Sequence, residues 1–228
     1  MSLWTRITEA LAALAQGEGL AAVFEKLSTP PEKTVAFAIA VIALSAKMAK
    51  ADGVVTRDEV TAFREIFYIS PEEEHNAARI YNLARQDVAG YEHYANQIAR
   101  MFGADKSVLC DLMEGLFSIA TADGNYHAGE DSFLSRVAEI FGIPQRDFKA
   151  IRVRFVPDAA PDPYTILGIS PTMSMDEARA AWRKLVRDNH PDQMIARGVP
   201  EEAIKMASKR MAAINDAWEE FLRERGAA

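Results

Sequence analysis

The chain has 228 residues, a hydrophobic fraction of 49% and a formal net charge of −7. A chain of this length can bury a sizeable core and accommodates one or two domains. The acidic balance excludes nucleic acid as the default partner, because phosphate binding needs a basic surface or stripe. The single cysteine, Cys110, excludes an internal disulfide and a multi-thiolate metal site, and its apolar neighbours predict a buried, unreactive thiol.

The start of the chain predicts neither a targeting signal nor a transmembrane segment. Residues 1–19 lack a charged region followed by an apolar block and a cleavage site. The longest apolar run, residues 35–46, is too short to span a bilayer, which takes about 20 residues. An amphipathic helix is predicted over residues 3–14, either docked on the domain or, alternatively, in peripheral contact with a membrane or partner. We expect a cytoplasmic protein without a cofactor.

The first two thirds of the chain predict an all-α domain. Residues 32–51 are apolar almost all round, which is typical of a helix at the centre of a helical bundle. A capping box at Thr56-Arg57-Asp58-Glu59 opens a helix that ends near Tyr68. Two further helices are predicted over residues 71–86 and 90–102.

Residues 116–131 repeat the plan of residues 44–59. Each stretch has the end of a helix, then Ala-Asp-Gly, then a glutamate seven residues after the aspartate. The economical interpretation is an internally duplicated helical hairpin.

The same spacing matches the second half of an EF-hand calcium loop. Its candidate metal ligands are Asp52, Glu59, Asp123 and Glu130. The two earlier ligand positions hold no carboxylate: they are Met48 and Lys50 in one copy, Ile119 and Thr121 in the other. We therefore predict no metal site and interpret each Asp-Gly as a helix end and each glutamate as the start of the next helix, with Val55 and Tyr126 as buried turn residues.

Paired Ala-Asp-Gly hairpins in an all-helical domain resemble the TerB (tellurite-resistance) fold. The resemblance covers roughly residues 20–155 and implies a helical bundle. An acidic ion site of that family could only fall on the four carboxylates named above. In the second copy, His127 replaces the capping Thr56.

This first domain is predicted over residues 1–155 and includes an N-terminal helical extension over residues 1–30. A proline-rich linker over residues 156–161 follows and leads to a C-terminal module over residues 162–228. Asp162 and Pro163 predict a short capped helix at the start of the module.

Two long helices follow and form a predicted antiparallel hairpin. Ser174 and Glu177 form a capping box that opens the first helix. It must end near Asn189, because Pro191 has no N–H and forces the residue before it out of the α region. Pro200 opens the second helix. The loop between them, residues 189–200, presents His190-Pro191-Asp192 on an exposed turn.

The first of these helices has an apolar stripe of Ala178, Trp182 and Leu185. Its neighbouring face is strongly positive and consists of Arg179, Arg183, Lys184 and Arg187. One interpretation is an ordinary solvated face. The functional interpretation is a docking surface, because the cations lead directly into the exposed turn.

Four ordered blocks of this module resemble a J domain, the module by which DnaJ-type co-chaperones engage a DnaK-type chaperone ATPase. The blocks are Asp162-Pro163-Tyr164 with Leu167-Gly168-Ile169, Trp182-Arg183-Lys184-Leu185-Val186, His190-Pro191-Asp192 and Ala213-Ile214-Asn215-Asp216-Ala217-Trp218. A TerB-like domain before such a module resembles the DjlA group. Trp182 and Trp218 replace the usual tyrosines and Gln193 a common lysine, and the N-terminal membrane helix of that group has no counterpart in this sequence.

The resemblance implies a non-enzymatic activator. The basic face would dock on an acidic surface of the chaperone's ATPase domain, Asp192 would pair with a partner arginine, and His190 and Pro191 would shape the turn. No glycine/phenylalanine-rich segment or cysteine-rich repeat is present, so client or partner binding falls to the TerB-like domain. The alternative is a stress-linked ion-sensing or scaffold protein of the tellurite-resistance type. His190 and Asp192 lack the third orienting group that an enzyme would need.

Overall fold

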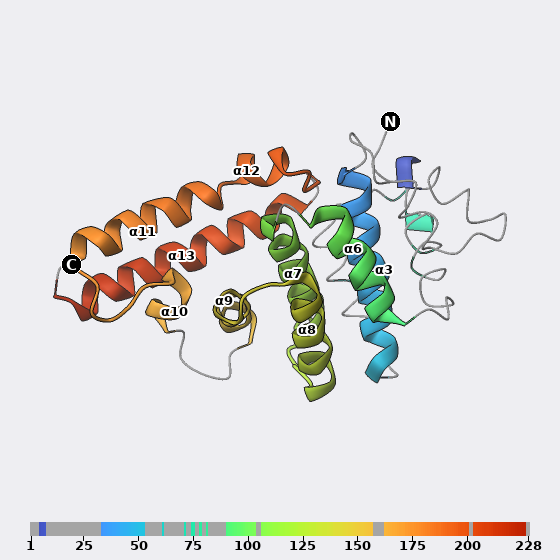
Figure 1. Ribbon diagram of the computed structural model, residues 1–228, viewed down its shortest axis with the longest axis horizontal. Coiled ribbons are helices and arrows are strands. Elements are labelled where there is room, and N and C mark those ends of the chain that lie inside the picture. The colour runs from blue at the N-terminus through green and yellow to red at the C-terminus, as the bar shows by residue number, and fades with distance from the viewer. Residues whose placement is uncertain are drawn as a thin grey trace.

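The structure, a computed structural model, describes residues 5–7, 33–52, 61, 71, 74–75, 78, 81, 90–103, 106–156, 162–200 and 203–226 (Figure 1). Its helices include α3 (Lys33–Asp52), α6 (Tyr91–Phe102), α7 (Lys106–Ala120), α8 (Ala128–Phe141), α9 (Gln145–Phe155), α10 (Pro163–Leu167), α11 (Met175–Asp188), α12 (Pro191–Ala196) and α13 (Ile204–Glu224). Over these ranges the chain forms helices and turns only, which confirms the all-α prediction. The predicted helices over 3–14, 56–68 and 71–86 fall mostly outside the described residues.

Helix α3 is the central element of the first domain. It packs against α6, α7 and α8, and its side chains from Val35 to Met48 are all buried. Ser45 fits this apolar surrounding because its hydroxyl donates to the Val41 carbonyl at 2.6 Å. The predicted helix over residues 32–51 is therefore confirmed to within one residue at each end. None of the helices in the described ranges is long and apolar enough to cross a membrane.

The turn between α7 and α8 shows how the second Ala-Asp-Gly hairpin is built. The Asp123 carboxylate accepts from the Asn125 N–H at 2.8 Å, and the Glu130 carboxylate accepts from the His127 N–H at 2.9 Å. The half-buried ring of Tyr126 packs against the core beneath the turn. The predicted role of Glu130, to start the next helix, is confirmed in this copy.

The C-terminal module is an antiparallel pair of helices, α11 and α13, with the short α10 packed against both (Figure 1). Trp182 and Trp218 stack between the two long helices, with ring centroids 5.0 Å apart and planes 9° apart. Asp162 caps α10, and Ser174 and Glu177 form the predicted capping box of α11. These local predictions are confirmed.

The loop of this hairpin differs from the prediction. Pro191 ends α11, as predicted, but it also occupies the first position of α12, where its fixed φ and missing N–H are favourable. The loop therefore contains a six-residue helix, and α13 begins at Ile204 rather than Pro200. Val156, assigned to the linker by its sequence, is buried in the core of the first domain.

The two parts of the chain pack against each other rather than being joined only by the linker. Met194, Val199 and Met206 belong to the same buried cluster as the first domain. Gly115 of α7 lies at this contact. A Cβ added to Gly115 would lie 3.7 Å from the Met206 sulfur and 3.7 Å from a Val41 methyl carbon. Helices α3, α7 and α13 therefore meet at one point.

Gly115 gives a direct test of this packing. The added methyl of Gly115→Ala makes ordinary contacts, so we expect the free energy of unfolding to rise by about 0.5 kcal/mol through the helix preference of alanine. Gly115→Leu overfills the contact and should lower the free energy of unfolding by about 1–3 kcal/mol. Urea denaturation followed by circular dichroism measures both. Gly129→Leu, where the Cβ meets no atom within 4 Å, is the control; equal losses at both sites would contradict the packing.

Cys110 is a half-buried free thiol. Burial, and then the negative charge of Asp111, raises its pKa to about 11. At pH 8 the thiolate is then about 0.1% of the population, so we expect Ellman's reagent to react slowly with the native protein and rapidly in urea. A native rate equal to that of the unfolded chain would contradict this environment.

Candidate protein-docking surface

Helix α11 divides into the two faces that its sequence predicts. Ala178 is buried, and Trp182 and Leu185 pack partly buried against the hairpin core. The side chains of Arg179, Arg183, Lys184 and Arg187 are all exposed. The Asp188 carboxylate lies 3.7 Å from Arg187 Nε, and both groups are solvated, so this pair contributes little to stability. The face is available to a partner.

The His-Pro-Asp turn begins where this face ends. His190 caps α12: its Nδ1 accepts from the Asp192 N–H at 3.3 Å, which leaves Nε2 directed elsewhere. The His190 side chain is 54% exposed and that of Asp192 is 83% exposed. The turn therefore presents an imidazole and a carboxylate to solvent in a hydrogen-bonded backbone conformation.

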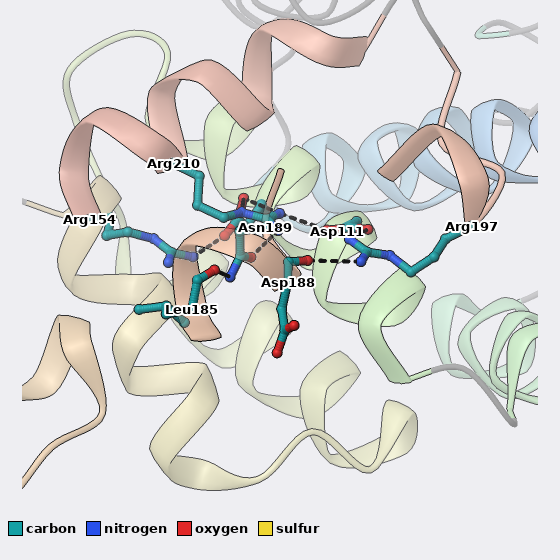
Figure 2. A network of polar contacts seen from close by, with 8 residues as sticks. Asp111, Arg154, Leu185, Asp188, Asn189, Arg197 and Arg210 are labelled. Carbon is teal, nitrogen blue, oxygen red and sulfur yellow. Dashed lines mark hydrogen bonds and ion pairs between the residues drawn. The ribbon is translucent and has the colours of Figure 1, made fainter. Parts of the chain in front are cut away.

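Two arginines fix the residues just before the turn, as Figure 2 shows. Arg210 Nη1 donates to the Asn189 side-chain oxygen at 2.7 Å, and Asn189 Nδ2 donates to the Leu185 carbonyl at 2.7 Å. Arg197 Nη1 donates to the Asp188 carbonyl at 3.0 Å. The last turn of α11 is thus bonded to α12 and α13 as well as to its own helix.

The same arginines reach the first domain. Arg210 donates to Asp111 at 2.7 Å and to Glu114 at 2.7 Å, and Arg197 donates to Asp111 at 3.0 Å. Both carboxylates come from α7 and are buried. Arg154 of α9 pairs with Glu114 from the other side. Burial, and then the positive charge of Arg210, lowers the pKa of Arg154 to about 9, so its guanidinium stays charged at neutral pH.

Sequence reasoning singled out the turn and the basic face but not this buried network. A signal was present: Asp111 and Glu114 stand three residues apart in an otherwise apolar helical run from Val108 to Phe117. On a helix, residues at this spacing share one face. Two carboxylates on a buried face require cationic partners, although the sequence does not say which ones.

The candidate metal ligands are only partly placed by the structure. Asp123 and Glu130 make the turn and capping hydrogen bonds of the α7–α8 hairpin. The side chains of Asp52 and Glu59 lie outside the described residues, so a joint site stays a prediction. Over the part of the chain that is described, no group of three or more His, Cys, Asp and Glu side chains is placed to bind a metal ion.

Comparison with known proteins gives several matches. The chain is 25% identical over 198 residues to Co-chaperone protein DjlA of Coxiella burnetii, which covers 78% of this chain and 73% of that protein. It is 22% identical over 237 residues to the protein of the same name from Photobacterium profundum, which covers 92% and 86% respectively. For that of Vibrio cholerae the identity is 24% over 212 residues, with 78% and 74% covered. No solved structure gives a significant match.

Two family models also match, and they do so in consecutive parts of the chain. The model for tellurite resistance protein TerB matches residues 38–153, which is more than half of the sequence. The model for the DnaJ domain matches residues 162–225 and so includes the basic face and the turn. The chain therefore belongs to the tellurite resistance protein TerB family and carries a DnaJ domain after its TerB domain, in the DjlA-like arrangement that its sequence motifs predict.

Proposed function

We propose that this protein is a J-domain co-chaperone. It stimulates ATP hydrolysis by a DnaK-type chaperone and is not itself an enzyme. The DnaJ-domain match and the relatives named as co-chaperones support the class. The observation that carries the proposal is the exposed His190 and Asp192 at the end of the exposed basic face. We place this activity in the cytoplasm.

The basic face of α11 supplies encounter and orientation. The whole chain carries a net charge of −7, which on average repels an acidic partner. Four clustered cations reverse this field locally, which favours one orientation of docking and speeds association. The acidic surface of the chaperone's ATPase domain is the proposed complement of Arg179, Arg183, Lys184 and Arg187.

The turn supplies the specific contact. Within the described residues, the ionisable neighbour of the Asp192 carboxylate is His190, whose Nδ1 lies 3.5 Å away, but that nitrogen accepts from the Asp192 N–H and so offers the carboxylate no proton. The carboxylate is therefore accessible to an arginine of the chaperone, and a desolvated charge-assisted bond of this kind contributes about 1.5–3 kcal/mol. Ile195, 41% exposed one turn further along α12, adds an apolar contact beside it.

The TerB domain supplies targeting or the binding of a client or partner in this proposal. Larger DnaJ proteins bind clients through a cysteine-rich repeat and a glycine/phenylalanine-rich segment. This sequence has a single cysteine and no such segment. The DnaJ domain, in turn, uses its exposed face for the chaperone. The TerB domain is thus the part of this chain that is proposed to bind a second partner.

Substitution of His190 by glutamine tests the turn. Glutamine keeps the size and polarity but not the Nδ1 contact that orients Asp192, so we expect His190→Gln to abolish most of the stimulation. The measurement is single-turnover ATP hydrolysis by a DnaK-type chaperone with and without the full chain. His127→Gln, a histidine that also begins a helix, is the matched control and should stimulate as wild type does. Equal stimulation by His190→Gln would overturn the proposal.

Charge reversal tests the basic face. We expect Arg183→Glu to raise the concentration for half-maximal stimulation about tenfold at low salt, with a smaller difference at 0.5 M salt, where charges are screened within about 4 Å. Arg146→Glu makes the same charge change at a cation on α9 that is 77% exposed. If both variants had a similar effect, or if the effect of Arg183→Glu did not depend on salt, the basic face would be an ordinary solvated face and not a docking surface.

A further inference from the structure

One carboxylate of the TerB domain lies at the centre of the bonds that lead to the His-Pro-Asp turn. Asp111 accepts from Arg210 with one oxygen and from Arg197 with the other, at 2.7 and 3.0 Å. Each arginine then donates onward to one of the two residues before His190, Arg210 to the Asn189 side chain and Arg197 to the Asp188 carbonyl. Figure 2 shows both guanidiniums directed at Asp111.

Burial makes these bonds effective. The Asp111 side chain is fully buried, and those of Arg210 and Arg197 are 5% and 16% exposed. Solvent therefore screens the charges weakly, and the planar guanidinium fixes the direction of each bond in a way that an ammonium group would not. Arg210 uses three nitrogens on three different side chains: Glu114, Asp111 and Asn189. Loss of Asp111 would remove one bond from each of the two guanidiniums at once.

The apolar contacts and the hydrogen bonds restrain different ends of α12. Met194 in α12 and Val199, just after this helix, pack in the core of the TerB domain. Asp188 and Asn189, at the near end, set where α11 stops and hence where His190 begins α12. The bonds through Asp111 act on that near end.

We infer that Asp111 is a positioning residue for the His-Pro-Asp turn: through Asp111 and the two arginines that it binds, the TerB domain sets the orientation of His190 and Asp192. The inference depends on the proposed function for its effect on ATP hydrolysis. The structural part, control of the turn by a carboxylate of another domain, can be measured independently.

The test compares Asp111→Asn with wild type in the full chain. Asparagine keeps the shape of aspartate but places a donor where one guanidinium donates. We expect the amides of Gln193 and Met194, which donate to the His190 carbonyl at 2.9 and 3.3 Å, to exchange hydrogen about tenfold faster or more. We also expect half-maximal stimulation of the chaperone to require about fivefold more protein or more. Amides in the middle of α11 and α13 should keep their protection.

Asp131→Asn is the matched control. Asp131 is also a TerB-domain carboxylate that accepts from an arginine, Arg152 at 3.0 Å, and from the Tyr126 hydroxyl at 3.0 Å, but it has no bond to the hairpin loop in the described residues. It should leave exchange at Gln193 and Met194 unchanged. If Asp111→Asn fails to fold, Arg197→Met removes one of the two paths while Arg210 keeps Asp111 and Glu114 paired, and it should show the same effects at reduced size.

The outcomes separate the two proposals. Unchanged exchange at the turn and unchanged stimulation in Asp111→Asn, or in Arg197→Met if the first variant does not fold, would overturn the positioning role while leaving the proposed function intact. Failure of the wild-type protein to stimulate a DnaK-type chaperone would overturn the proposed function. The hydrogen-exchange rates alone would then decide whether Asp111 positions the turn. A general loss of protection across α11 and α13 in the folded variant would assign Asp111 to stability rather than to positioning.

Discussion

The constraint on which this structure depends is the burial of two carboxylates on one face of α7. A charged group removed from water without a partner costs several kcal/mol, so Asp111 and Glu114 require cations that the apolar helices around them do not provide. Within the described residues these cations are Arg154 from α9 and, from the C-terminal hairpin, Arg197 and Arg210. Docking of the hairpin on the TerB domain therefore supplies cations that neutralise the buried carboxylates of that domain.

The charged and apolar parts of this contact have different roles. Met194, Val199 and Met206 provide non-directional apolar burial, which tolerates small shifts of the hairpin. The guanidinium–carboxylate bonds are directional, and a shift of an ångström breaks them. Buried ion pairs add little net stability relative to apolar packing but select one arrangement, so the angle between the basic face and the TerB domain is the property that they determine.

Local signals allowed much of this fold to be predicted, and the rest required contacts between distant residues. The apolar run of α3, the Ser174 capping box and the Asp162 cap each depend on residues within a few positions of one another. Helix α12 was missed because a proline that ends one helix can also begin another. The bonds from Arg197 and Arg210 to the two buried carboxylates join residues 86 to 99 positions apart, and nothing near Arg210 in the sequence distinguishes it from the solvated arginines of α11.

The two halves of the sequence repeat in the TerB domain differ at this contact. When the two Ala-Asp-Gly turns are aligned, Asp111 and Glu114 of α7 correspond to Ala40 and Ala43 of α3, both of which are buried in apolar surroundings. One copy of the helix has thus kept a purely apolar face and serves the bundle, whereas the other carries two acids on the equivalent face and receives the hairpin. The two copies of the repeat thus differ at the surface that receives the hairpin, and the two acids distinguish the copy that carries the second domain from the copy that serves only the bundle.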